Sequence, residues 1–250
     1  EIGRLSEDFD RMAGQVEQNI LDLKESVERQ ERFVSSFTHE LKTRMTAVLG
    51  YADLLRSQDL TEEEQRDAAN YIFSEGKRLE RLSLKLLDIY VADREEITLS
   101  AHSPGRIVRD MAEHLEPGYR SQGIELSCSC EEGQCLLEPD LFRSLLVNLL
   151  DNARKALTEG GAIQVSVKMT GEGCTLTVQD DGPGIPEESL ARLTEAFYRV
   201  DKSRSRRQGG AGLGLTLCAK IVELHKGSLN FESREGKGTK VTAELKGGRL

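Results

Sequence analysis

The sequence lacks the features that several protein classes require. Its five cysteines are odd in number and form no CxxC pair, which favours neither a disulfide framework nor a zinc ribbon. No apolar run approaches the roughly 18 residues of a membrane span, and the N-terminus does not have the shape of a signal peptide. We therefore expect a chain that does not itself cross a membrane, with buried thiols at Cys128, Cys130, Cys135, Cys174 and Cys218.

Positive charge is also in short supply. The 34 basic residues face 43 acidic ones, a net charge of −9, which argues against a general nucleic-acid or anionic-membrane binder and makes any anion site a local one. With 250 residues and 38% hydrophobic content, the chain can hold one large or two small packed domains. It contains no internal repeat and no low-complexity tract.

Residues 5–55 show the spacing of a coiled-coil helix. Apolar residues recur mostly at alternating steps of four and three, which is the pattern of a coiled-coil seam. The seam positions are Leu5, Phe9, Met12, Val16, Ile20, Leu23, Val27, Val34, Phe37, Leu41, Met45, Val48, Ala52 and Leu55.

A second helix is predicted to begin at a capping box. The Thr61 side chain can accept a hydrogen bond from the backbone, while the Glu64 side chain reaches back to the Thr61 backbone amide. An apolar stripe follows at Ile72, Leu79, Leu82, Leu86 and Ile89. The short stretch 57–60 joins the two helices into an antiparallel hairpin. Because a hairpin has little interior of its own, we expect two copies to pair as a dimeric four-helix bundle.

After residue 93 the pattern changes to short β-like runs separated by helical stretches and glycine turns, which predicts a second domain of α+β type. The expected strands lie around Ile97 and at 124–128, 163–169, 174–178, 228–233 and 239–245.

Three polar residues share one face of the helix predicted at 140–157. Asn148 and Asn152 are one turn apart and Lys155 follows three residues later. Two carboxamides and an ammonium suit a magnesium-bound triphosphate. A single asparagine on a helix more often caps it or faces solvent, so this face needs support from elsewhere in the chain.

Such support follows in three segments. Asp180, Gly182 and Gly184 lie after a predicted strand, where a carboxylate and a glycine turn can receive an amine-bearing ring. The segment 209–215 is glycine-rich and leads into an amphipathic helix, whose N-terminus favours phosphate. Between them, residues 198–207 carry five basic residues and one acid, the sign expected for a segment that closes over polyphosphate or for a solvated loop.

In this order the four elements resemble the N, G1, F and G2 boxes of the histidine-kinase ATP-binding domain. They read "NLLDNARKAL", "DDGPGIP", "LTEAFYRVD" and "GAGLGLTL", and the resemblance extends over residues 103–245. It implies an α/β sandwich related to the gyrase, Hsp90 and MutL ATPases, with ATP and Mg²⁺ as cofactors. It also implies that Asn152 binds Mg²⁺, that Asp180 accepts from the adenine amine in a pocket shaped by Gly182 and Gly184, and that the phosphates lie near Asn148, Lys155, Arg199, Gly210, Gly212, Leu213 and Gly214.

His39 differs from the other three histidines by its position. Because Phe37 and Leu41 lie on the seam, His39 points away from it and can meet a nucleotide held by a second domain. Glu40 is placed to orient the ring and take its proton. A zinc-protease motif would need a second metal ligand at position 43, where the chain has Thr43, so that class is excluded.

The stretch "FTHELKT" resembles the H box of the dimerisation and phosphotransfer domain of sensor histidine kinases. The resemblance implies that His39 is the phospho-acceptor, Glu40 the base, and Thr43 the residue that positions water for phosphatase action. The start, "EIGRLSEDFDRMA", is similar to the end of a HAMP module, so the predicted domains are 1–30, 31–93 and 94–250.

The resemblance implies a two-component enzyme with defined partners. We expect a homodimeric cytoplasmic portion of a bacterial membrane receptor, which passes a phosphoryl group to an aspartate of a response regulator and binds no nucleic acid. A related ATP-driven clamp and a nucleotide-responsive dimeric scaffold remain as alternatives.

Arg44 departs from the family pattern, which has proline after "HELKT". Proline would remove a backbone donor and bend the helix, whereas arginine is a good helix former, so we predict a straighter first helix. Arg44 also lies four residues after Glu40, within ion-pairing distance on a helix. Our hypothesis is that Arg44 shifts the ratio of kinase to phosphatase activity.

Overall fold

The computed structural model describes residues 2–94, 97–158, 160–200 and 212–248. The chain forms two compact units, Glu1–Gly76 and Lys77–Leu250, and the division between them falls inside the second helix.

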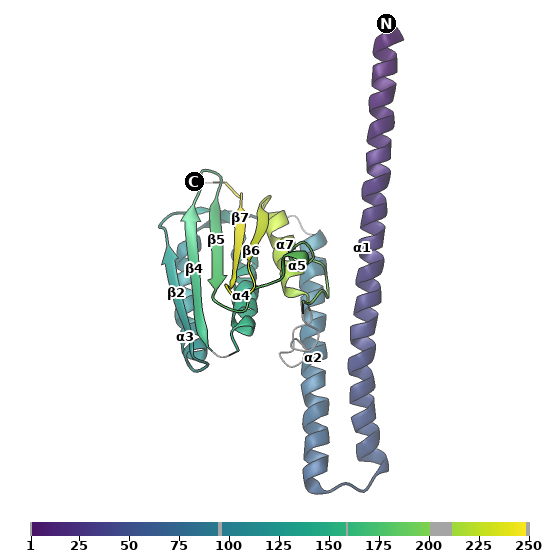
Figure 1. Ribbon diagram of the computed structural model, residues 1–250, viewed down its shortest axis with the longest axis vertical. Coiled ribbons are helices and arrows are strands. Elements are labelled where there is room, and N and C mark those ends of the chain that lie inside the picture. The colour runs from purple at the N-terminus through teal and green to yellow at the C-terminus, as the bar shows by residue number, and fades with distance from the viewer. Residues whose placement is uncertain (1, 95–96, 159, 201–211, 249–250) are drawn as a thin grey trace. The chain divides into compact units, whose positions relative to one another are not determined.

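The first unit is built from a long helix and the beginning of another, α1 (Ile2–Ser57) and α2 (Glu62–Arg94), joined as a hairpin (Figure 1). Helix α1 continues through Arg44 without a break, as the absence of proline predicts. The capping box at the start of α2 is confirmed, because the Thr61 amide donates to Glu64 Oε2 (2.9 Å) and the Glu64 amide donates to Thr61 Oγ1 (3.3 Å).

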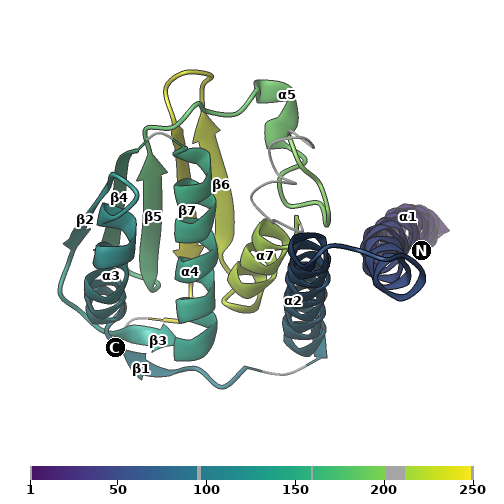
Figure 2. The ribbon, with the colours of Figure 1, turned by 90° about the horizontal axis from the view of Figure 1, so that it is seen from below.

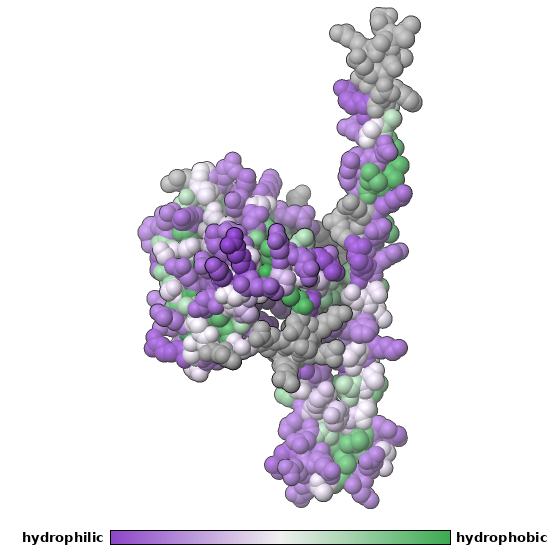
Figure 3. Space-filling model, viewed as in Figure 1, coloured by the Kyte–Doolittle hydropathy of each residue, from purple (hydrophilic) through white to green (hydrophobic). Residues whose placement is uncertain are grey.

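Much of the predicted α1 seam is exposed in the single chain. Among the seam side chains that the structure describes, seven residues have exposed fractions between 46% and 65%. They are Met12, Val16, Ile20, Leu23, Val27, Val34 and Met45. Figure 3 shows hydrophobic residues, in green, on the surface of the same helix. An apolar stripe of this length is typical of a helix that packs against another chain, so the four-helix bundle remains the prediction for this unit.

The second unit contains a five-stranded sheet with the strand order β2-β4-β5-β7-β6, in which only β2 and β4 are parallel. A separate antiparallel pair is formed by β1 and β3. After α2 the described elements are β1 (Ser100–His102), α3 (Pro104–Arg120), β2 (Ile124–Cys130), β3 (Cys135–Leu137), α4 (Pro139–Ala156), β4 (Gly161–Met169), β5 (Cys174–Asp180), α5 (Glu187–Leu190), α7 (Gly214–Leu224), β6 (Ser228–Ser233) and β7 (Thr239–Leu245).

Helices α3, α4 and α7 cover one face of the sheet (Figure 2). On β5, Cys174, Leu176, Val178 and Asp180 are buried while the intervening residues are more exposed, as the two-residue period of a strand requires. The sheet meets α4 through Phe142, Leu145 and Leu149, which recur at helical spacing, are almost fully buried and belong to the same core. The predicted fold, a helical hairpin followed by an α/β sandwich, is confirmed.

Some local predictions were wrong. The strand expected around Ile97 is the three-residue strand Ser100–His102, and its partner β3 was not predicted. Of the five cysteines, all of which are free, only Cys135, Cys174 and Cys218 are buried, while Cys128 is exposed.

In the part of the chain that the structure describes, no helix is long and apolar enough to span a membrane. In the same residues, no cluster of three or more histidine, cysteine or acidic side chains is placed to hold a metal ion.

Candidate active site

Asp180 is the last residue of β5 and one of the few buried charged residues, with 7% of its surface exposed. Its Oδ1 accepts hydrogen bonds from the amides of Gly182 (3.0 Å) and Thr239 (3.3 Å). Burial raises the pKa of this carboxyl, and the two amide donors oppose that rise. Because both bonds end on Oδ1, Oδ2 is the oxygen placed to accept from a ligand.

A cavity of about 90 Å³ lies against Asp180. Its polar lining comes from Asn152, Asp180 and Thr239, and most of the rest is apolar. The apolar walls are formed by Leu149, Ala153, Ala156, Val178, Ile185, Leu193, Leu215, Phe231 and Val241, with Gly184 completing the lining. An apolar slot with one buried acceptor fits a flat ring that carries an amine.

The turn after β5 depends on its two glycines. A side chain at Gly182 would place its Cβ 2.8 Å from Asp180 Oδ1. Gly184 has φ +73°, and a Cβ there would lie 2.0 Å from the carbonyl oxygen of Arg234. Both glycines therefore let the backbone pass close to the carboxylate and to the cavity.

The polar face of α4 brings Asn148 and Asn152 toward this region. Asn148 is buried, with its amide nitrogen donating to the Ser144 carbonyl (2.8 Å) and its Oδ1 accepting from Lys85 Nζ (2.8 Å). Asn152 lines the cavity, and its buried Nδ2 has no hydrogen-bond partner among the described residues. A buried amide without a partner is costly, so Asn152 is the α4 residue best placed to meet a ligand.

Lys155 is bound within α4, since its Nζ lies 2.5 Å from Asp151 Oδ2. Burial disfavours the charged form of Asp151, but the hydrogen bonds from Lys155 and Arg154 lower its pKa overall. Lys155 does not line the cavity. The structure therefore places it on the same helix as Asn152 but engaged with a neighbouring carboxylate.

The start of α7 lies next to the polar face of α4. Gly212 has φ +72°, Leu213 is fully buried, and a Cβ on Gly214 would lie 3.1 Å from Asn148 Oδ1 and 3.8 Å from Asn152 Nδ2. The positive end of this 11-residue helix therefore lies beside both asparagines.

The F-box segment is bound through its backbone to the residues just before α7, because the Phe197 amide donates to the Gly212 carbonyl (2.8 Å). Arg199 is partly buried and is not among the residues that line the cavity. Gly210 and most of the predicted basic segment, residues 201–207, lie outside the described residues.

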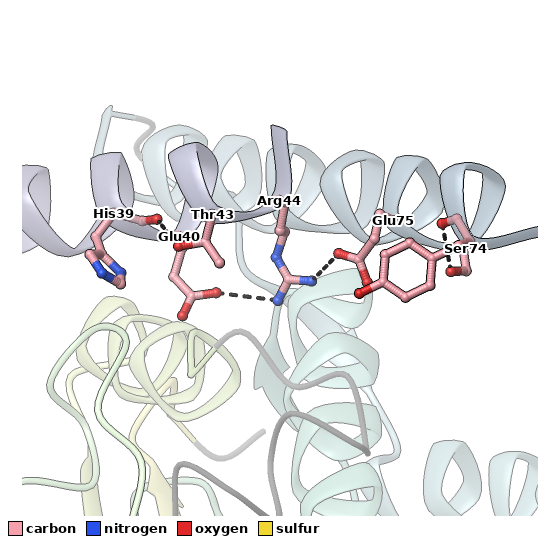
Figure 4. A network of polar contacts seen from close by, with 7 residues as sticks. His39, Glu40, Thr43, Arg44, Ser74 and Glu75 are labelled. Carbon is pink, nitrogen blue, oxygen red and sulfur yellow. Dashed lines mark hydrogen bonds and ion pairs between the residues drawn. The ribbon is translucent and has the colours of Figure 1, made fainter. Parts of the chain in front are cut away.

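In the first unit His39 is exposed, as its place off the seam predicts. The Thr43 hydroxyl donates to the His39 carbonyl (2.9 Å). Figure 4 shows the Glu40 carboxylate turned along α1 toward Arg44, and Glu40 Oε2 lies 3.2 Å from Arg44 Nη2. The predicted pairing of Arg44 with Glu40 is therefore confirmed.

Two residues of the site were missed from the sequence. Thr239 binds Asp180 through its amide and lines the cavity, and Lys85 binds Asn148. The only sequence signal for Thr239 was its place after "GKG", in a segment similar to the family. Lys85 had no signal, because its contact joins residues 63 positions apart.

Two protein families match the chain. Residues 29–94 match the His Kinase A (phospho-acceptor) domain, and residues 137–249 match the histidine kinase-, DNA gyrase B-, and HSP90-like ATPase. The sensor histidine kinase YclK of Bacillus subtilis is 30% identical over 249 residues, which cover 98% of this chain and 52% of that protein. The histidine-protein kinase ArlS of Staphylococcus aureus is 29% identical over 242 residues, covering 96% and 52%. The chain thus spans about half the length of these relatives.

Solved structures share the fold. A histidine kinase, ThkA, in complex with the response regulator protein TrrA has a TM-score of 0.70 at 22% identity, covering 90% of this chain and 66% of that one. The Acinetobacter baumannii histidine kinase AdeS has a TM-score of 0.62 at 17% identity, covering 83% and 98%. With both domain families matched, the chain belongs to the histidine kinases and comprises their phospho-acceptor and ATP-binding domains.

Proposed function

We propose that this chain is the catalytic part of a sensor histidine kinase, which moves the γ-phosphoryl group of ATP to His39 and from there to an aspartate of a response regulator. The observation that carries the proposal is the exposed His39, followed by Glu40, in a chain that also has a buried carboxylate in an apolar cavity. YclK and ArlS are histidine kinases by name, and ThkA has been crystallised with a response regulator.

The nucleotide would be held by the cavity and by the start of α7. Asp180 Oδ2 accepts from the adenine amine, and the apolar walls enclose the ring. The Asn152 amide and the N-terminal amides of α7 face the phosphates, with Asn148, Lys155, Arg199 and the 210–214 loop as further contacts. Asn152 also fits a Mg²⁺ ligand, because its amide oxygen is a hard donor beside the phosphate site. Mg²⁺, when bound, neutralises phosphate charge.

The reaction needs an accessible nucleophile and a proton acceptor. A ring nitrogen of His39 attacks the γ-phosphorus, the bond from that phosphorus to the β–γ bridging oxygen breaks, and ADP leaves with the electron pair. Glu40 takes the proton from the other ring nitrogen. Thr43, one turn from His39, would orient the water that removes the phosphoryl group from the regulator.

The same proposal covers assembly and location. The exposed apolar stripe of α1 supports a homodimer in which two hairpins form a four-helix bundle. The domains would be 1–30, the end of a HAMP module, 31–93 and 94–250, in the cytoplasmic part of a bacterial membrane receptor.

Incubation with γ-labelled ATP and Mg²⁺ tests the proposal. The chain should acquire an acid-labile, alkali-stable label that is lost in His39→Gln and kept in His114→Gln, a matched control because His114 is also an exposed helical histidine. ATP hydrolysis without label would favour the clamp, and ATP binding without either would favour the scaffold.

A further inference from the structure

A stripe of buried and half-buried side chains on α2 is interrupted by an acid. The stripe recurs at steps of four and three and consists of Ala68, Ile72, Glu75, Leu79 and Leu82. Its middle member, Glu75, is an acid, and only 4% of its surface is exposed. A carboxylate at such a position needs a cation from the facing helix, because an unpaired buried charge is strongly unfavourable.

Arg44 of α1 supplies that cation. Its Nη1 lies 3.1 Å from Glu75 Oε2 and its Nη2 lies 3.2 Å from Glu40 Oε2 (Figure 4). The side chains of Arg44 and Glu75 are 13% and 5% exposed, and that of Glu40 is 25% exposed. One guanidinium therefore serves two carboxylates, and the three residues form a charged layer across the hairpin.

This charged layer is not the arrangement that stability alone would favour. Arg44 Nε is buried and has no hydrogen-bond partner among the described residues. Apolar residues of similar volume often pack as well as, or better than, a buried ion pair, and they leave no donor unsatisfied. The energetics therefore favour a role beyond packing, and the place of Glu40 in the layer indicates which role.

Glu40 is the proposed base for His39, the residue immediately before it. The attraction of Arg44 keeps the Glu40 carboxylate turned along α1 toward the guanidinium, whereas proton transfer requires it at the His39 ring. How strongly Arg44 holds Glu40 depends on Glu75, because the two carboxylates share one positive charge.

We propose that Arg44 and Glu75 are positioning residues that hold Glu40 away from His39, so that contact between α1 and α2 sets the rate at which His39 is phosphorylated. The inference rests on the proposed role of Glu40 as the base. It assigns Glu75, which no sequence motif singles out, a place in the same reaction.

Two substitutions should act in opposite directions. The double change Arg44→Leu with Glu75→Leu removes the ion pairs of the layer and releases Glu40 from Arg44. It should raise the rate by about threefold or more, a modest coupling for residues in contact. Glu75→Gln leaves the guanidinium to Glu40 alone and should lower the rate by a similar factor. Glu80→Gln, which removes an exposed acid paired with Lys77 on the same helix, is the matched control and should change nothing.

The rate is measured with two phosphoryl donors. With ATP, the measured quantity is kcat for phosphorylation of His39, and the KM for ATP should not change. With phosphoramidate, the His39 nitrogen attacks phosphorus, the P–N bond breaks, ammonia leaves with the electron pair, and Glu40 takes the proton from the other ring nitrogen. The second donor reports on Glu40 without the ATP-binding domain, so a parent chain that is labelled by phosphoramidate but not by ATP contradicts the proposed function and leaves the inference testable.

Each variant is repeated in a Glu40→Gln background. The inference predicts that both rate changes then fall below about twofold, because they act through Glu40. Changes of the same sign in the two variants, changes that survive in Glu40→Gln, or equal rates in all chains would overturn it. Circular dichroism checks that each variant is folded. If the double variant does not fold, Glu75→Gln, which keeps the side-chain volume, tests the inference by itself.

Discussion

Replacing Asp180 by asparagine separates its role in nucleotide binding from its role in the fold. Oδ1 of the asparagine can still accept from the Gly182 and Thr239 amides, so the turn after β5 keeps both of its bonds. At the other position, however, an NH₂ donor replaces the Oδ2 acceptor that we propose for the adenine amine. The NH₂ group of the asparagine and the adenine amine are then two donors that face each other in the cavity.

The size of the effect follows from the lost hydrogen bond. A hydrogen bond to a charged group contributes roughly 1.5–3 kcal/mol, so Asp180→Asn should weaken ATP binding by about 10- to 150-fold. Its free energy of unfolding should change little, because the variant also removes the cost of burying a charge, the same cost that raises the pKa of this carboxyl.

Isothermal titration with ATP and GTP provides the assay, with urea unfolding as the measure of stability. Guanine carries an oxygen acceptor where adenine carries the amine, so the variant should lose its preference for ATP over GTP. An ATP affinity within about twofold of the parent, at normal stability, would refute the assignment of Asp180 as the adenine acceptor.

Three further outcomes are expected. ATP affinity of the parent should fall as the pH drops through the pKa of Asp180, and because burial raises that pKa, the loss should begin above the usual aspartate range and be absent in Asp180→Asn. Burial lowers the pKa of His225, so the unfolded state binds protons more tightly than the folded state does. The free energy of unfolding should therefore fall as the pH drops below about 6.5, by at most about 1.4 kcal/mol per pH unit. In His225→Gln this pH profile should be flatter. Gly184→Ala should lower the free energy of unfolding by about 1–3 kcal/mol, because Gly184 has a positive φ and a Cβ there would meet the Arg234 carbonyl. Gly76 is a helical glycine with open space around it, so Gly76→Ala should raise the free energy of unfolding by about 0.5–1 kcal/mol. Urea titrations measure both changes.

The parts of the fold that could be predicted are those whose signals are local. The Thr61 capping box needs only four consecutive residues, and the long helix through Arg44 follows from its period and from the lack of proline. The four boxes likewise carry their residues in short segments, which is why the sequence alone is enough to identify the family.

The rest depends on contacts between distant segments. Strand β3 has three residues and is a strand only because it pairs with β1, more than thirty positions earlier, so its length gave no period to detect. Glu75 interrupts an apolar stripe, and only the position of Arg44 on the other helix explains it. Thr239 acts through its backbone amide, which no side-chain pattern reveals.

The central claim is that phosphoryl groups from ATP reach His39. The most direct test is to incubate the chain with ATP and Mg²⁺, digest it at alkaline pH, and locate the modification by tandem mass spectrometry. The account predicts one phosphorylated peptide, carrying the group on the His39 ring, that is absent in His39→Gln and reduced in Asp180→Asn. Release of ADP with no modified peptide, or a phosphoryl group at any other residue, would contradict it.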